Sequence, residues 1–179
     1  NFKKDEIMMY GFHHNGLNEF DNEHFRAASL LNNVLLKSGV ATLSKSELQK
    51  IDANNTFSLQ SYSGEIQAGY SGKCNQDEFN AFLERLHLMI TQPRIDTKVL
   101  NNYKNRIALS IKERKNNPSL LFTDERNHFL YNNHPRKKTW TQKMLDSVTG
   151  DVLEELSQNQ KSLPNESSFV FVGNVNADT

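Results

Sequence analysis

Residues that could bind a metal are few and widely spaced in this sequence. His13 and His14 are adjacent, so on a strand their side chains point to opposite faces and cannot both bind one ion. His24 and His87 lie elsewhere, and neither an HxxxH nor an HxxEH spacing occurs in the chain. A metal site would need ligands that converge from distant segments. We therefore expect structural or exposed histidines and predict no metal-binding residue.

Candidate nucleophiles also lack the neighbours that would activate them. Cys74 is the single cysteine, so it cannot form an internal disulfide, and its immediate neighbours supply one cation, Lys73. An inert, buried thiol is the expected state. The sequence contains no GxSxG motif, the strand-to-helix turn that exposes a nucleophilic serine, and Ser63–Gly64 falls where a hairpin turn is expected. No catalytic residue is predicted.

Charged residues gather at two places. Glu19, Asp21 and Glu23 precede a predicted helix, where carboxylates cap backbone N–H groups and complement the helix dipole. The run 136–138 (Arg-Lys-Lys), with Tyr131 and Trp140 nearby, is either a small anion or nucleic-acid patch or a solvated loop. The chain has 21 basic and 21 acidic residues, which favours the solvated loop and excludes a broad nucleic-acid surface. We expect protein or peptide partners and no nucleic acid.

The elements that must position these residues follow from hydrophobic periodicity, caps and breakers. The helix that ends at Pro93 is expected to begin at Asn75, and the helix after Asp96 to bury Leu100 and Leu109. Alternating apolar residues on both sides of Ser63–Gly64 predict a hairpin. The complete expectation is strands at 6–12, 57–61, 66–70 and 169–172, and helices at 21–38, 44–51, 75–92, 96–115, 118–130 and from 149.

This order of elements predicts an α+β fold, a mostly antiparallel sheet with helices packed on one face. A length of 179 residues suits one core, so residues 1–179 are expected to form a single domain. No apolar run approaches the roughly 20 residues of a membrane-spanning helix, so no membrane span is predicted. The chain begins at Asn1 without Met, and we expect a fragment of a longer chain.

A set of short segments, in order, resembles a known family. They are residues 2–9, Gly11–Phe12, Gly16, Ala27–Ala28, Lys37–Val40, Ser44–Leu48, Gln92–Asp96, Asn117–Pro118, Leu130–Arg136 and Phe169–Asn174. Together they resemble the third domain of long bacterial zinc metallopeptidases of the pitrilysin/insulinase family. The resemblance covers nearly the whole chain.

The resemblance implies repeated α+β domains that enclose a chamber in which peptides are cut. Only the first domain of the family holds zinc, through an HxxEH motif on the helix after the first strand. The equivalent helix here places Ser29, Asn32 and Asn33 where His, Glu and His would be required. The later stretch 107–111 also lacks the carboxylate of the third ligand. The resemblance thus implies no cofactor in this chain and zinc in the first domain of the parent protein.

On this basis the chain is expected to be an inactive domain that forms part of the chamber wall and helps peptide binding. Its partners would be the other domains of the same peptidase and the peptide substrate. Two alternatives stay open: a stand-alone binding or scaffold module, and an inactive subunit paired with a separate zinc-bearing subunit. By resemblance, a periplasmic or cell-envelope location is favoured and a cytoplasmic one is not excluded.

Overall fold

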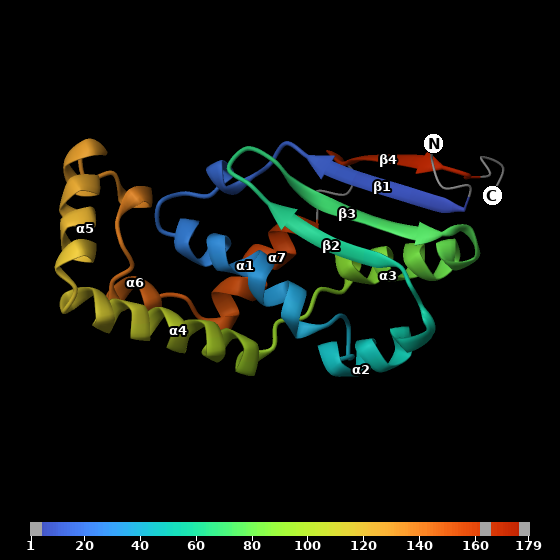
Figure 1. Cartoon of the computed structure of the whole chain (residues 1–179), viewed down its shortest axis with the longest axis horizontal. Helices are drawn as coiled ribbons and strands as arrows, with labels where there is room; N and C mark the ends of the chain where they lie inside the picture. The colour runs from blue at the N-terminus through green and yellow to red at the C-terminus, as the bar shows by residue number, and fades with distance from the viewer. Residues whose placement is uncertain (1–4, 162–165, 176–179) are drawn as a thin grey trace.

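Four antiparallel strands form one sheet at the top of the molecule as drawn in Figure 1. The computed structural model describes residues 5–161 and 166–175. The strands are β1 (Glu6–His13), β2 (Ser58–Ser63), β3 (Ala68–Asn75) and β4 (Ser168–Gly173), in the order β2-β3-β1-β4. The first strand is therefore central, and the hairpin and the last strand add to its two sides.

The described residues form seven helices; most of them lie below the sheet in Figure 1, and α5 stands beyond the end of the sheet. They are α1 (Phe25–Ser38), α2 (Lys45–Ile51), α3 (Phe79–Thr91), α4 (Thr97–Lys115), α5 (Pro118–Leu130), α6 (Gln142–Asp146) and α7 (Gly150–Lys161). The predicted α+β class, with helices on one face of an antiparallel sheet, is confirmed. No helix in the described residues is long and apolar enough to cross a bilayer.

The alternation of β1 explains why only one sheet face is covered. Ile7 and Met9 are buried, whereas Met8 and Tyr10 are exposed on the opposite face. Ile7 and Met9 belong to a core with Phe82 and Leu86 of α3. A second core joins α1, α4 and α7, with members such as Leu31, Leu100 and Leu153. The helix α1 thus stands between the sheet and the outer helices.

Local end signals account for several helix boundaries. Ser44 and Glu47 form a reciprocal capping box at the start of α2, as their spacing predicts. Asp96 accepts hydrogen bonds from two backbone N–H groups of α4, and Asn117 does the same for α5. Gly39 has φ +100° directly after α1, and a Cβ there would lie 2.1 Å from the Leu43 carbonyl oxygen.

The hairpin departs from the prediction. The N–H of Gly64 donates to the carbonyl of Gln67, so the turn spans 64–67 and β3 begins at Ala68 rather than at 66. Ile66, expected in a strand, lies on the turn with 71% of its surface exposed. Pairing with β1 extends β3 to Asn75, because every residue of β1 has a partner on β3. The helix α1 also begins later than predicted, at Phe25 rather than at 21.

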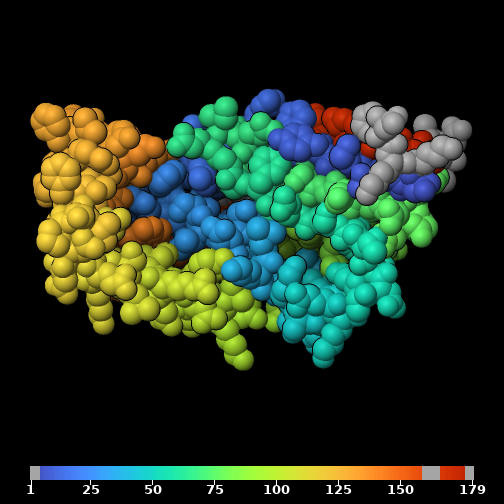
Figure 2. Space-filling model, in the orientation of Figure 1, coloured from blue at the N-terminus to red at the C-terminus, as the bar shows by residue number. Residues whose placement is uncertain are grey.

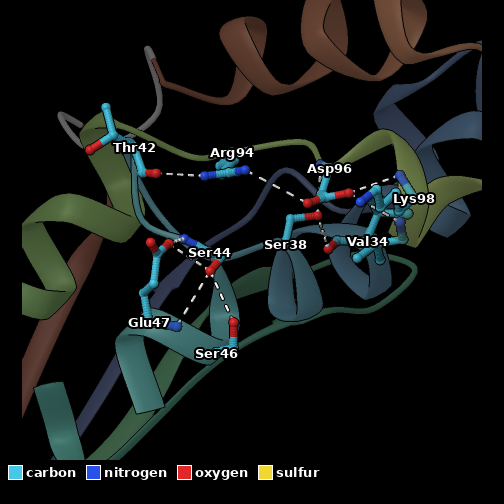
Figure 3. A network of polar contacts seen from close by, with 10 residues as sticks. Val34, Ser38, Thr42, Ser44, Ser46, Glu47, Arg94, Asp96 and Lys98 are labelled. Carbon is cyan, nitrogen blue, oxygen red and sulfur yellow. Dashed lines mark hydrogen bonds and ion pairs between the residues drawn. The ribbon is translucent and has the colours of Figure 1, made fainter. Parts of the chain in front are cut away.

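A polar network joins the end of α1, the loop before α2 and the start of α4 (Figure 3). The hydroxyl of Ser38 donates to the Val34 carbonyl and accepts from the Asp96 N–H. Arg94 donates to the Thr42 carbonyl at 2.6 Å and lies 3.7 Å from the Asp96 carboxylate. Two of the segments that carry the family resemblance, Lys37–Val40 and Gln92–Asp96, therefore meet here and fix the positions of three helices.

Candidate functional site

The helix face predicted to replace a zinc motif points toward the edge strand β2. Asn32 accepts a hydrogen bond from the Ser61 hydroxyl at 2.6 Å, and its amide lies 3.4 Å from the Ser61 carbonyl oxygen. Ser29 donates to the Arg26 carbonyl within its own helix, and Asn33 is exposed. The three side chains lie three and four residues apart and so share one helix face. Their correspondence to a degenerate metal motif stays a prediction.

The strand β2 has an open edge beside this face. Within the described residues it pairs only with β3. Gly64 and Gln67 form a hydrogen-bonded pair, and the antiparallel alternation then turns the backbone groups of Leu59, Ser61 and Ser63 away from β3. Asn32 already hydrogen-bonds to Ser61 on this edge. The helix α1 therefore blocks the centre of the edge for pairing with another strand and leaves the two ends of the edge open.

A pocket of about 300 Å³ lies beneath β2, and we call it the β2 pocket. Figure 2 shows its opening as a hollow between β2, α1 and α2. Its apolar wall includes Leu35, Leu36, Leu48, Leu59 and Met89. The volume is at the lower end of the range for ligand pockets, enough for one large side chain or a small apolar molecule.

An ion pair forms one polar part of the β2 pocket. Arg85 donates to both carboxylate oxygens of Asp52, at 2.6 and 2.9 Å. Both side chains are mostly buried, and their opposite charges are paired. The β2 pocket thus combines an apolar wall with a paired charge, and its lining also includes Lys45, Asn32 and Ser58.

His13 also lines the β2 pocket. It is the last residue of β1 and is 8% exposed, while its neighbour His14, one residue past the strand, is exposed. The Nδ1 atom of His13 is covered and has no hydrogen-bonding partner among the described residues. Burial lowers the pKa of His13 below its usual 6.5; Glu166 opposes this shift, and His14 adds to it.

We expect the stability of the fold to fall as the pH drops below about 6.5. A proton binds His13 more readily in the unfolded chain than in the folded one, so acid favours unfolding until the folded-state pKa is passed. Urea denaturation from pH 8 to 5 measures this dependence. The His13→Leu variant should show a weaker dependence, whereas His87→Leu, which changes an exposed histidine, should keep that of the wild type. An unchanged dependence in His13→Leu would contradict the assignment.

The remaining candidates do not assemble into a reactive centre. Cys74 is buried in β3, as predicted, and burial, with smaller effects of Glu78 and Asp77, raises the pKa of its thiol to about 11. Ser63 ends β2 and Gly64 begins the hairpin turn. In the described ranges no three His, Cys, Asp or Glu side chains lie together as a metal site would need.

The basic run 136–138 has a role that sequence patterns missed. Arg136 donates to the Phe20 carbonyl at 2.5 Å and to Asn22 at 3.1 Å, and its guanidinium lies 4.9 Å from the Phe25 ring centre. Arg26 of α1 donates in return to the carbonyls of Pro135, Arg136 and Lys138. The run is thus a joint between the segment after α5 and the segment before α1. Nothing local marks it, because its partners lie more than 100 residues away.

Comparisons with known proteins agree with this fold. No protein-family model and no curated protein sequence matches the chain. Among solved structures, the periplasmic protease PqqL from Escherichia coli matches 98% of this chain and 19% of its own, with 20% identity and a TM-score of 0.86. A peptidase M16 inactive domain from Pseudomonas fluorescens matches 97% of this chain and 42% of its own, with 17% identity and a TM-score of 0.73.

The fold also matches within the first half of PqqL. That structure covers 97% of this chain and 39% of its own, with 12% identity and a TM-score of 0.68. The chain spans about a fifth of the length of full PqqL and about two fifths of the other two structures. The better match to full PqqL than to its first half indicates that the fold occurs more than once in that protein. The chain therefore has the fold of pitrilysin-type M16 peptidase domains, as the resemblance in its sequence predicts.

Proposed function

We propose that this chain is a non-catalytic domain of a longer zinc metallopeptidase of the pitrilysin/insulinase type. The observation that carries the proposal is the match to PqqL over 98% of the chain at a TM-score of 0.86. The match to a solved M16 inactive domain supports the same conclusion. Ser29, Asn32 and Asn33 are neutral and lack the imidazole and carboxylate groups that bind zinc and activate water.

The place of the domain in the parent protein would be the C-terminal half, as its third domain. Support comes from the TM-score of 0.68 to the first half of PqqL, against 0.86 to the full protein. The zinc would then be bound in the first domain, outside this chain. The solved relative is named a periplasmic protease, and a periplasmic location is proposed for the parent as well.

The role of the domain would be architectural and peptide-binding. It would form part of the wall of a closed proteolytic chamber and keep bulk water from the catalytic half. The β2 pocket, beside the partly open edge of β2, suits an apolar side chain of a bound peptide. Because Asn32 binds Ser61, an extended peptide would pair with the ends of this edge and not with its centre.

Zinc content and peptide hydrolysis, measured side by side, test the proposal. The full-length protein that contains this sequence should hold zinc and cleave a quenched fluorescent peptide, and chelation should abolish the cleavage. A preparation of residues 1–179 alone should show neither property. The reading frame should also encode an HxxEH helix upstream of this sequence.

Two results would overturn the proposal in different ways. Stoichiometric zinc with chelator-sensitive hydrolysis in residues 1–179 alone would make this chain the catalytic unit. A complete reading frame without an HxxEH segment would leave a binding module or an inactive subunit, and co-purification with a zinc-bearing subunit would separate those two.

A further inference from the structure

The helix α5 presents an unusual amount of apolar surface. The exposed fraction is 84% for Phe129, 69% for Phe122, 63% for Leu130 and 45% for Leu121. None of the residues of α5 is buried, and α4 is its main neighbour among the elements. Figure 1 shows α5 at the end of the molecule that is farthest from β4, standing across the end of α4.

The polar side of α5 is the side that is held. Asp124 accepts from Arg114 of α4 at 2.6 Å and from the Thr139 hydroxyl at 2.6 Å. Phe122 and Phe129 are seven residues apart, so they form one stripe along two helical turns. The Asp124 contacts hold the helix in an orientation in which this stripe faces outward. The contacts of Asp124 thus keep both phenylalanine rings exposed in the folded domain.

A helix in this situation lacks most of what stabilises helices in proteins. A 13-residue helix is marginal on intrinsic propensity alone and depends on the burial of an apolar face. Clustered exposed aromatic residues of this kind mark interaction surfaces. Two phenylalanine side chains can bury about 300–500 Å². That is enough for the centre of an interface between domains of one chain, which covers about 600–1,500 Å².

We propose that the Phe122–Phe129 stripe of α5 docks against a second domain of this same fold in the same polypeptide. This inference rests on the proposed function and names the surface through which the domain joins its parent. The fold occurs more than once in PqqL, and this chain spans 42% of the solved inactive-domain structure. In these solved relatives, further chain accompanies the matched fold, and such chain can cover α5. The partner surface is apolar, because the stripe offers two aromatic rings and no unpaired buried charge.

Hydrogen exchange in the full-length protein tests this docking. In the wild type, the amides of 122–130 should be protected at least tenfold more than in the double variant Phe122→Glu/Phe129→Glu, because two carboxylates in an apolar interface prevent docking. The amides of β1 and β3 should be unchanged, since both rings are exposed in this domain. Ile66→Glu is the matched control, because Ile66 is 71% exposed on the hairpin turn and should leave α5 protected.

Several outcomes decide the matter. Equal protection of α5 in the wild type and the double variant would overturn the docking, even where zinc and peptide hydrolysis support the proposed function. Conversion of a dimer of the full-length protein to a monomer by the double variant would show that a second copy covers the stripe, and would also overturn it. If the double variant misfolds, the single variant Phe129→Glu, at the more exposed ring, repeats the same comparison.

Discussion

Replacement of Phe82 by alanine is expected to lower the free energy of unfolding by about 3–5 kcal/mol, the cost of deleting a buried phenylalanine side chain. Phe82 has no exposed surface and lies between α3 and the sheet. Its ring meets Phe57 edge to face at 6.0 Å. A Cβ built on Gly72 would lie 2.7 Å from the ring, so the backbone of β3 approaches it closely. The cavity left by alanine therefore opens directly under the sheet.

Urea denaturation of the purified chain measures this effect. Phe129→Ala is the matched control, because it removes the same side chain from a position that is 84% exposed, and it should change the stability by less than about 0.5 kcal/mol. Similar losses in the two variants would show that α3 does not pack on the sheet as described.

Replacement of Arg136 by alanine is expected to cost about 2–3 kcal/mol, because hydrogen bonds from a charged donor contribute more than neutral ones and the Phe20 carbonyl is left without its donor. The stacking on Phe25 is lost as well. Arg136→Lys should lose most of the same stability, since one ammonium group cannot reach the several acceptors that the guanidinium fork binds.

Lys137→Ala is the control for the Arg136 variants. Lys137 lies 3.6 Å from Glu65 in an exposed ion pair, which contributes little to stability. Thermal or urea denaturation should place Lys137→Ala near the wild type and both Arg136 variants well below it. An Arg136→Ala variant as stable as Lys137→Ala would mean that the joint between α1 and the segment after α5 is not needed for folding.

Three of the segments that carry the family resemblance act as joints of the fold. Lys37–Val40 and Gln92–Asp96 meet through Ser38, Arg94 and Asp96 at the junction of three helices. The segment 130–136 ends in Arg136, which binds the loop before α1. A non-catalytic domain that keeps such joints preserves the shape of the unit, and this agrees with the architectural role proposed above.

Features that depend on three or four neighbouring residues could be predicted well. Examples are the capping box of Ser44 and Glu47, the left-handed Gly39 and the helix start at Asn117–Pro118. Each is formed by residues within one turn of chain, so the residue types alone are enough to predict it. Features that depend on pairing were predicted less well. The start of β3 at Ala68 follows from its ladder with β1, and Ile66 has the right residue type for a strand but no partner.

The exposed apolar residues mark the limit of periodicity as a guide. Leu109 was expected inside and is 59% exposed, and Phe122 and Phe129 are more exposed still. A helical pattern shows which residues share a face but not whether another element covers that face. Coverage is decided by the placement of α4 and α5 beyond the edge of the sheet.

The sequence by itself determined the α+β class, the succession of strands and of all helices except α6, the burial of Cys74 and the resemblance to pitrilysin-type domains, because these depend on residue type and on short-range spacing. Only the tertiary structure decided that Asn32 meets Ser61 on the β2 edge, that Arg136 binds the loop before α1, and that the Phe122–Phe129 stripe faces outward. Each of these depends on where elements far apart along the chain come to lie, and such contacts follow from the packing of the whole core and leave no local pattern.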